Sequence, residues 1–258
     1  MDYTPGWAIK GGSPNHEWNE PPNLSDWRAF VSRLSSEVRR HPNVLSLEIY
    51  NEENVKQWWA GTAADYDAVL AQGAASMCSA NPQLQVLFGG MVSPDTHWID
   101  EACATYGSGP TFDVLPFHAY PETWTPKDVQ VENYLGAGYR EFLNDADRNC
   151  GQQPIWINEA GFATTPGKTE LDQANWWARA IATFIAAPRV EHIGIYHIKD
   201  APKDKRVIGG VANLYLGPDV SRPQEETAFN TVASLTRSFK EGKITVADSE
   251  LSAKMVIG

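Results

Sequence analysis

Two glutamates each follow an asparagine at the end of a short apolar run. Glu52 stands in IYNEEN after Ile49, and Glu159 stands in WINEAG after Ile157. Two carboxyl groups at one site can divide acid–base work, because one protonates a leaving oxygen while the other meets a developing cationic carbon. That division of work is what the hydrolysis of an acetal requires.

Further polar and aromatic side chains follow other apolar runs. The sequence FHAYP contains His118 and Tyr120, and the last apolar run contains Tyr196. The plainer interpretation of Glu52 and Glu159 is that they are solvated loop acids, as most Asp and Glu residues are. Because such residues recur at the ends of several runs, and a charge at a buried strand end is costly, we favour one shared site.

The elements that would position these residues alternate between short apolar runs and longer amphipathic ones. The short runs predict buried strands over Val44–Ile49, Leu84–Gly89, Phe112–Phe117, Pro154–Ile157 and Ile193–Ile198. The longer stretches predict helices over Ser25–Arg40, Ala63–Ala80, Asp95–Tyr106, Asp128–Asn149, Leu171–Ala187 and Gln224–Lys240. This alternation predicts an α/β fold with a parallel sheet, whose reactive groups lie at the carboxyl ends of the strands.

Aromatic residues are numerous, with 10 Trp, 9 Tyr and 9 Phe in 258 residues. Aromatic rings either fill the core or offer flat faces on which sugar rings stack. Trp58 and Trp59 come shortly after Glu52, and the sequence is equally consistent with a stacking platform and with an anchor for the next helix. The pair Trp176–Trp177 lies within a predicted helix and is expected in the core.

Charge and hydropathy exclude two classes of partner. The chain has 21 basic and 32 acidic residues, a net charge of −11, and no dense basic patch, so it should repel nucleic acid and anionic membranes. No apolar run approaches the roughly 20 residues that cross a bilayer. The opening MDYTPGWAIKGG lacks the features of a signal peptide, and the sequence leaves the localisation open.

Three cysteines, Cys78, Cys103 and Cys150, cannot all pair within one chain. None lies at a spacing typical of a metal site. Free cysteines are usually buried, so we expect three buried thiols. No metal and no cofactor is expected.

Three motifs carry a resemblance to a known family. LEIYNEENV, PFHAYPET and IWINEAGFAT resemble the motifs that end the fourth, sixth and seventh strands of clan-A retaining glycoside hydrolases, especially families 39 and 5. In that clan the Asn-Glu pair carries the general acid/base and the later Glu is the nucleophile. The resemblance therefore implies Glu52 as the acid/base, Glu159 as the nucleophile, and Asn51 as a partner of the sugar 2-hydroxyl.

The same resemblance implies further substrate-binding residues. It places His118 and Tyr120 beside the nucleophile and gives Tyr196 as the aromatic residue of the last strand. The segment DYTPGWA resembles the end of the third strand of the clan, which places Trp7 near the sugar.

The resemblance begins at the third strand, so the expected fold is an incomplete TIM-type (β/α) barrel over residues 1–242, with about six βα units that correspond to strands three to eight. Residues 243–258 contain two short apolar runs, Ile244–Val246 and Met255–Ile257, and resemble the start of a β-sandwich. Open strand edges and an apolar wall need a cover. We expect a homodimer to provide it; the tail or a different polypeptide are the alternatives.

The sequence is consistent with three functions. The leading hypothesis is a retaining glycoside hydrolase that cleaves β-glycosidic bonds of an oligosaccharide, polysaccharide or simple glycoside by double displacement. The second is an inactive barrel remnant that binds carbohydrate. The third is a metal-dependent hydrolase that uses His118 and His197, which the absence of a His-x-His motif disfavours. The sequence leaves open which sugar is cleaved, and whether cleavage is exo or endo.

Overall fold

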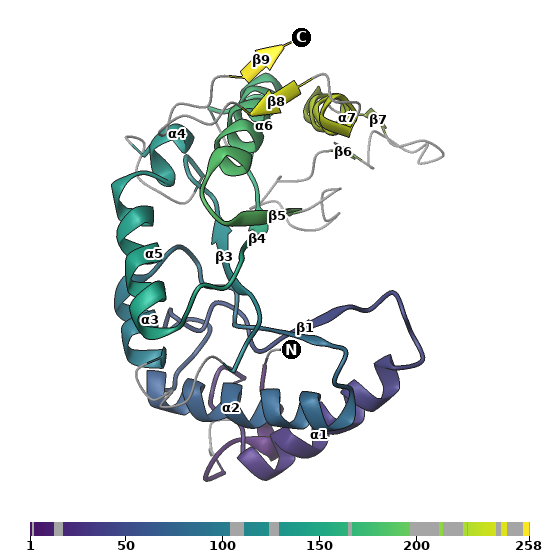
Figure 1. The fold of residues 1–258 in the computed structure, drawn as a ribbon, viewed down its shortest axis with the longest axis vertical. Coiled ribbons are helices and arrows are strands. Elements are labelled where there is room, and N and C mark those ends of the chain that lie inside the picture. Colours follow the sequence, from purple (N-terminus) through teal and green to yellow (C-terminus); the bar gives the residue numbers. More distant parts are fainter. Residues whose placement is uncertain are drawn as a thin grey trace. The chain divides into compact units, whose positions relative to one another are not determined.

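The computed structural model describes residues 1, 3–12, 18–103, 111–123, 129–164, 167–196, 212–213, 224–225, 227–240, 244–246 and 255–257. Along these residues strands and helices alternate (Figure 1). The chain divides into two compact units, each described by itself below. The first comprises Met1–His118 and Arg140–Trp156, and the second comprises Ala119–Tyr139 and Ile157–Gly258.

The first unit is built on consecutive parallel strands. They are β1 (Ser46–Glu48), β2 (Gln85–Leu87) and β3 (Leu115–Ala119), the last of which ends in the second unit. β1 and β2 pair in parallel, and parallel bridges from Leu87 to Val114 and from Met91 to Phe117 continue the pairing toward β3. Met1 lies beside the end of β1, since its amino group donates to Glu48 O at 2.9 Å.

Helices precede, separate and follow these strands. They are η1 (Gly6–Ala8), α1 (Leu24–Val38), α2 (Ala63–Ala80), α3 (Thr96–Cys103), α4 (Val131–Tyr134), α5 (Ala137–Asn149), α6 (Glu170–Ala186) and α7 (Thr227–Lys240). The sequence of α2 begins with a capping box between Thr62 and Asp65, which satisfies backbone N–H groups at the helix start. α1 packs on α2, and the indole of Trp27 donates to Val69 O at 2.8 Å.

The second unit receives the ends of β3 and β4 (Ile155–Ala160) and adds β5 (Val190–Ile195). These strands form a sheet in the order β3-β4-β5. Two short antiparallel pairs follow, β6 (Ala212–Asn213) with β7 (Gln224–Glu225) and β8 (Ile244–Val246) with β9 (Met255–Ile257). The β8–β9 pair confirms the two strands predicted in the tail.

Several predictions about elements need correction. The helix predicted over Asp128–Asn149 is two helices, α4 and α5, separated at Leu135 and Gly136, because Leu135 leaves the helical region at φ −96 and ψ 42. The runs that become β1 and β5 were expected to be buried, yet β1 is half-buried and β5 is largely exposed. Within the described residues, no set of strands closes into a barrel.

The prediction of three buried thiols was wrong. Cys103 and Cys150 form a disulfide with a Cα–Cα distance of 5.3 Å across 47 residues of sequence, and Cys78 is an exposed free thiol. The bond joins the end of α3 to the end of α5. The spacing of cysteines in a sequence does not show which helices pack together, so the pairing could not be predicted.

The core is rich in aromatic residues, as expected for part of the Trp content. Trp59, Trp176 and Trp177 are fully buried, which confirms that Trp176–Trp177 packs in the core. In the portion of the chain that is described, none of the helices has the length and apolar character needed to span a membrane.

Candidate active site

Glu52 lies on a tight loop that follows β1. Tyr50 and Glu52 both have positive φ, 74° and 53°, a conformation that costs free energy in residues other than glycine and clusters at functional sites. The loop is fixed to the end of β2, since Glu52 N donates to Gly90 O at 2.9 Å. Asn51 forms a parallel bridge with the same Gly90. The buried hydroxyl of Tyr66 joins the ends of both strands, donating to Ile49 O and accepting from Gly89 N.

His118 lies against Glu52. A hydrogen bond of 2.7 Å joins its Nδ1 to Glu52 Oε1, and the His118 side chain is fully buried while that of Glu52 is 16% exposed. The imidazole can donate to an anionic carboxylate at Nδ1, or accept from a protonated one, depending on its tautomer. The resemblance gives His118 a place beside the nucleophile, and the bond described here connects it to the proposed acid/base.

Glu53 is the acidic residue that the sequence reasoning missed. It is 1% exposed, and burial raises its pKa to about 8; its backbone contacts and the Trp98 indole oppose this shift, and the charges of Glu48 and Glu52 add to it. The Trp98 N–H forms no hydrogen bond of good geometry with the described residues. Glu53, the residue that follows Glu52 in the sequence, is therefore a neutral acid near pH 7.

Gly89 makes room for the Glu53 side chain. A Cβ added at this position would lie 2.0 Å from Glu53 Oε2, which no packing adjustment of a buried side chain easily relieves. The doubled glutamate in NEENV was the available signal, because on this loop the Glu52 side chain is half-buried and the Glu53 side chain is fully buried.

Glu159 lies on β4 in the second unit. The hydroxyl of Tyr120 donates to Glu159 Oε2 at 2.6 Å. Glu159 is half-buried. The structure thus brings together two residues that the sequence assigned to the same part of the site.

The loop that carries Tyr120 is held by several neighbours. Trp176 Nε1 donates to Pro121 O at 3.1 Å, and Ala163 N donates to Thr123 Oγ1 at 3.1 Å. Between Pro121 and Thr123, the Glu122 carboxylate accepts a hydrogen bond from the Arg179 guanidinium at 2.5 Å. These contacts tie the loop to α6 and to the strand end after Glu159, so the Tyr120 hydroxyl is held in place.

Tyr196 follows β5 and lies near Tyr120. The two ring centroids are 6.3 Å apart and nearly perpendicular, and Tyr196 N donates to Ala160 O at 2.8 Å. Gly161 permits this approach, because a Cβ there would lie 2.5 Å from Tyr196 O and 2.9 Å from the Tyr120 ring. Close packing against Tyr196 and Tyr120 therefore explains why a glycine stands at position 161 in the NEAGF motif.

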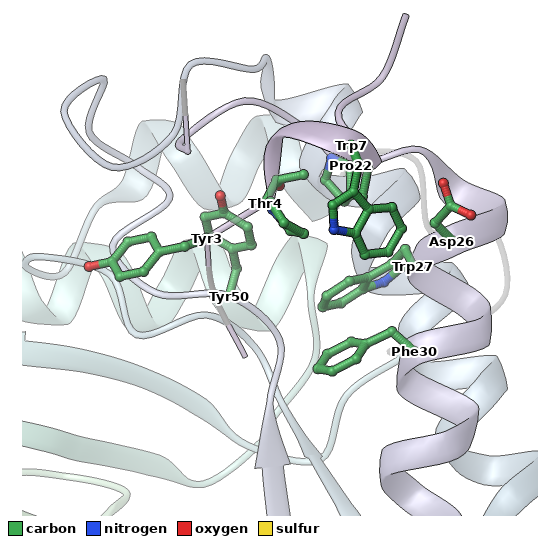
Figure 2. Close-up of a pocket in the computed structure, with 10 residues that line it drawn as sticks. Tyr3, Thr4, Trp7, Pro22, Asp26, Trp27, Phe30 and Tyr50 are labelled. Atoms are coloured by element: carbon green, nitrogen blue, oxygen red, sulfur yellow. The ribbon is translucent and has the colours of Figure 1, made fainter. Parts of the chain in front are cut away.

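Trp7 lies in a different setting from the carboxyl clusters. It is 77% exposed and lines an apolar pocket of about 270 Å³. Figure 2 shows Trp7, Trp27 and Phe30 one above another, with Tyr3 and Tyr50 on the other side of the pocket. Phe30 is 51% exposed although its helix position suggests an inward face.

The predicted residues fall into two groups. Asn51, Glu52 and His118 belong to the first unit, and Tyr120, Glu159 and Tyr196 belong to the second. The metal hypothesis joined His118 to His197, which lies outside the described residues. Of the two ring nitrogens of His118, Nδ1 is hydrogen-bonded to Glu52, and either nitrogen of an imidazole can bind a metal.

The fold is similar to that of solved glycoside hydrolases. A family 39 glycoside hydrolase from Bacteroides cellulosilyticus WH2 matches with a TM-score of 0.69 and 15% identity, over 95% of this chain and 51% of that one. A monomeric β-xylosidase from Caulobacter crescentus CB15 matches at 0.62 and 16%, over 91% and 50%. A GH2 β-galacturonidase from Eisenbergiella tayi matches at 0.62 and 15%, over 85% and 37%.

These likenesses show an α/β fold similar to glycoside hydrolase barrels. The chain spans about half the length, or less, of each of these three proteins. No protein-family model matches the sequence, and no curated protein matches it.

Proposed function

We propose that the protein is a retaining glycoside hydrolase that cleaves β-glycosidic bonds, with Glu52 as the acid/base and Glu159 as the nucleophile. The proposal rests on one contrast between the two glutamates. Glu52 is bonded to an imidazole, and Glu159 is bonded to a phenol. Imidazoles change protonation near pH 6.5 and phenols near pH 10.

This contrast fits the two roles. A general acid/base must gain and lose a proton in each cycle, and a neighbouring imidazole tolerates both states of Glu52. A nucleophile must stay anionic, and the Tyr120 hydroxyl donates a hydrogen bond to the carboxylate of Glu159 while keeping its own proton. The fold similarity to glycoside hydrolases supports the reaction class, and the roles of the two glutamates rest on their contacts.

The reaction would proceed in two balanced steps. In the first, Glu52 gives its proton to the glycosidic oxygen, the bond from that oxygen to the anomeric carbon breaks, and Glu159 forms an ester with the same carbon. In the second, Glu52 takes a proton from water, the water oxygen attacks the anomeric carbon, and Glu159 leaves as a carboxylate. Asn51, Tyr196 and Trp7 would bind the sugar.

The retaining mechanism sets a separation for the two carboxyl groups. We expect about 5 to 5.5 Å between those of Glu52 and Glu159, whereas an inverting enzyme needs about 6.5 to 9.5 Å. A crystal structure with a bound sugar measures this directly, and a much longer separation would exclude the pairing.

The test of the function is turnover of a panel of nitrophenyl β-glycosides. The solved neighbours include a β-xylosidase and a β-galacturonidase, so the panel should contain neutral and acidic sugars. Proton NMR of the first product should show the β-anomer. Carbohydrate binding without any turnover would instead support the inactive remnant, and sensitivity to a chelator would revive the metal hypothesis.

A further inference from the structure

Three aromatic side chains gather on the surface of the first unit. The ring centroids of Tyr3 and Trp18 are 4.7 Å apart, those of Trp18 and Trp58 are 5.6 Å apart, and those of Tyr3 and Trp58 are 6.2 Å apart. Tyr3 and Trp18 are each 45% exposed, and Trp58 is half-buried. We call these three residues the aromatic platform. An exposed apolar cluster of this kind marks a binding surface, since burial would otherwise be favoured.

The platform is held rigidly. Thr4 N donates to Trp18 O and Ala60 N donates to Asn19 O, each at 2.8 Å. The side-chain amide of Asn19 also donates to Lys56 O and to Gln57 O. These bonds join the three segments that carry the rings, so little conformational entropy remains to be lost on binding.

Trp59 anchors the loop that carries Trp58. Its ring is 1% exposed and packs on Tyr50 at 4.7 Å, while its indole N–H donates to Thr62 O at 3.0 Å. The sequence left open whether these two tryptophans form a stacking platform or anchor the next helix, and the two residues differ in this respect. Trp59 is the anchor, and Trp58 belongs to the platform.

The platform stands at the same end of β1 as Glu52. Val55 N donates to Glu52 O, and Trp58 N donates to Val55 O, so two successive turns connect the carboxyl group to the ring. Tyr50 N donates to Met1 O, which brings the segment of Tyr3 to this strand end. A group that protonates a leaving oxygen must lie beside the leaving group, so Trp58, two turns after Glu52 on the same loop, is the aromatic side chain assigned to that side.

The charges around the platform select an uncharged ligand. Residues 51–60 contain one basic residue, Lys56, and two acidic ones, Glu52 and Glu53. The ammonium group of Lys56 donates to Gly61 O at 2.8 Å. The whole chain has a net charge of −11, so a polyanionic sugar would be repelled.

We propose that Tyr3, Trp18 and Trp58 form a stacking subsite for an uncharged pyranose ring of an oligosaccharide, on the leaving-group side of Glu52. The C–H face of the sugar lies on the aromatic faces, which exclude water from both. This inference rests on the proposed function, and it adds that the substrate is a neutral glycan longer than a simple glycoside.

The test measures binding without turnover. The Glu159→Ala chain is titrated calorimetrically with cellohexaose, xylohexaose and a galacturonic acid hexamer. We expect a neutral hexamer to bind, and Trp58→Ala or Trp18→Ala in the same background to weaken that binding about tenfold. Leu45→Ala is the matched control, because Leu45 is 67% exposed at the other end of β1, and it should leave the affinity unchanged. Circular dichroism spectra show whether each variant folds, and Tyr3→Ala replaces any that does not.

Three outcomes would overturn the inference. They are no binding of either neutral hexamer at millimolar concentration, equal binding by the platform variants, and tighter binding of the galacturonic acid hexamer. Failure of the proposed function is separate, since absence of glycoside turnover leaves the binding result intact.

Discussion

The two glutamates of the candidate site differ most in the chemistry of their neighbours. Glu52 contacts a fully buried imidazole in the first unit, and Glu159 contacts the hydroxyl of Tyr120 in the second. Both follow an Asn in the sequence. The difference teaches that two similar local sequences can receive chemically different hydrogen-bond partners from the fold around them.

The largest effect should follow removal of the proposed nucleophile. Glu159→Ala should lower kcat about 10⁴-fold or more, since no covalent intermediate can form. Azide should restore turnover by attacking the anomeric carbon directly, and the product should then have inverted stereochemistry. NMR of the glycosyl azide measures this. Rescue with retained stereochemistry would contradict the assignment.

Removal of the proposed acid/base should act selectively. Glu52→Ala should lower turnover of glycosides with poor leaving groups by about 10² to 10⁴, the usual contribution of general acid catalysis. Formation of the glycosyl-enzyme from a dinitrophenyl glycoside should change little, because that leaving group departs unprotonated. Pre-steady-state release of dinitrophenol checks it, and equal loss on both substrates would count against the role.

The neighbours of the two glutamates can be compared directly. Tyr120→Phe should lower kcat roughly tenfold to a hundredfold, because a hydrogen bond to an anion is lost, and the shape of the pH–rate profile should stay the same. His118→Asn should change that shape, since it removes the imidazole that can donate to the ionised carboxyl group of Glu52 or accept from the protonated one. The same change of the pH–rate profile in both variants would contradict the proposed difference between the neighbours of Glu52 and Glu159.

Glu53→Gln should have a small effect on turnover near pH 6, below about twofold, because the native side chain is neutral there. Its effect on stability should grow with pH. The unfolded chain loses the Glu53 proton near the ordinary pKa of 4.5, and the folded chain keeps it to about 8. The native protein should therefore lose several kcal/mol of unfolding free energy as the pH rises through this window.

Urea unfolding of both chains between pH 4 and pH 9 measures this difference. The free-energy gap between Glu53→Gln and the native protein should widen from pH 4.5 to pH 8 and then level off. A constant gap would show that Glu53 is ionised in the folded state.

The strands and helices were largely predictable, because their signals are local. Apolar runs located the parallel strands, and α2 has the predicted bounds, Ala63–Ala80. The exposure of Phe30 and of β5 was not predictable, since periodicity says that a residue could face a core and not whether a neighbour covers it. On α1 the buried face runs through Trp27, Val31 and Ser35.

The sequence proposed residues for the candidate site, but it predicted neither their contacts nor the burial of Glu53. Motifs identified Glu52, His118, Tyr120 and Glu159. Which glutamate each partner contacts depends on loop geometry, including the positive φ of Glu52. The burial of Glu53 depends on the absence of a side chain at Gly89. Both are properties of packing between elements distant in sequence.

The association state is the remaining prediction, and its effect on turnover should be the smallest. We expect sedimentation equilibrium to show a homodimer at micromolar concentration, because exposed apolar side chains such as Phe30 and Leu171 favour association. An active monomer would reject the dimer.

The exposed thiol of Cys78 affects how that measurement must be made. During storage in air, two chains can be oxidised to a covalent pair through Cys78, and this pair would sediment like a native dimer. A reducing agent prevents the artefact, but it also threatens the bond between Cys103 and Cys150. The protein is therefore best purified as Cys78→Ser without reductant, and the native chain serves to reveal the disulfide-linked artefact on a non-reducing gel.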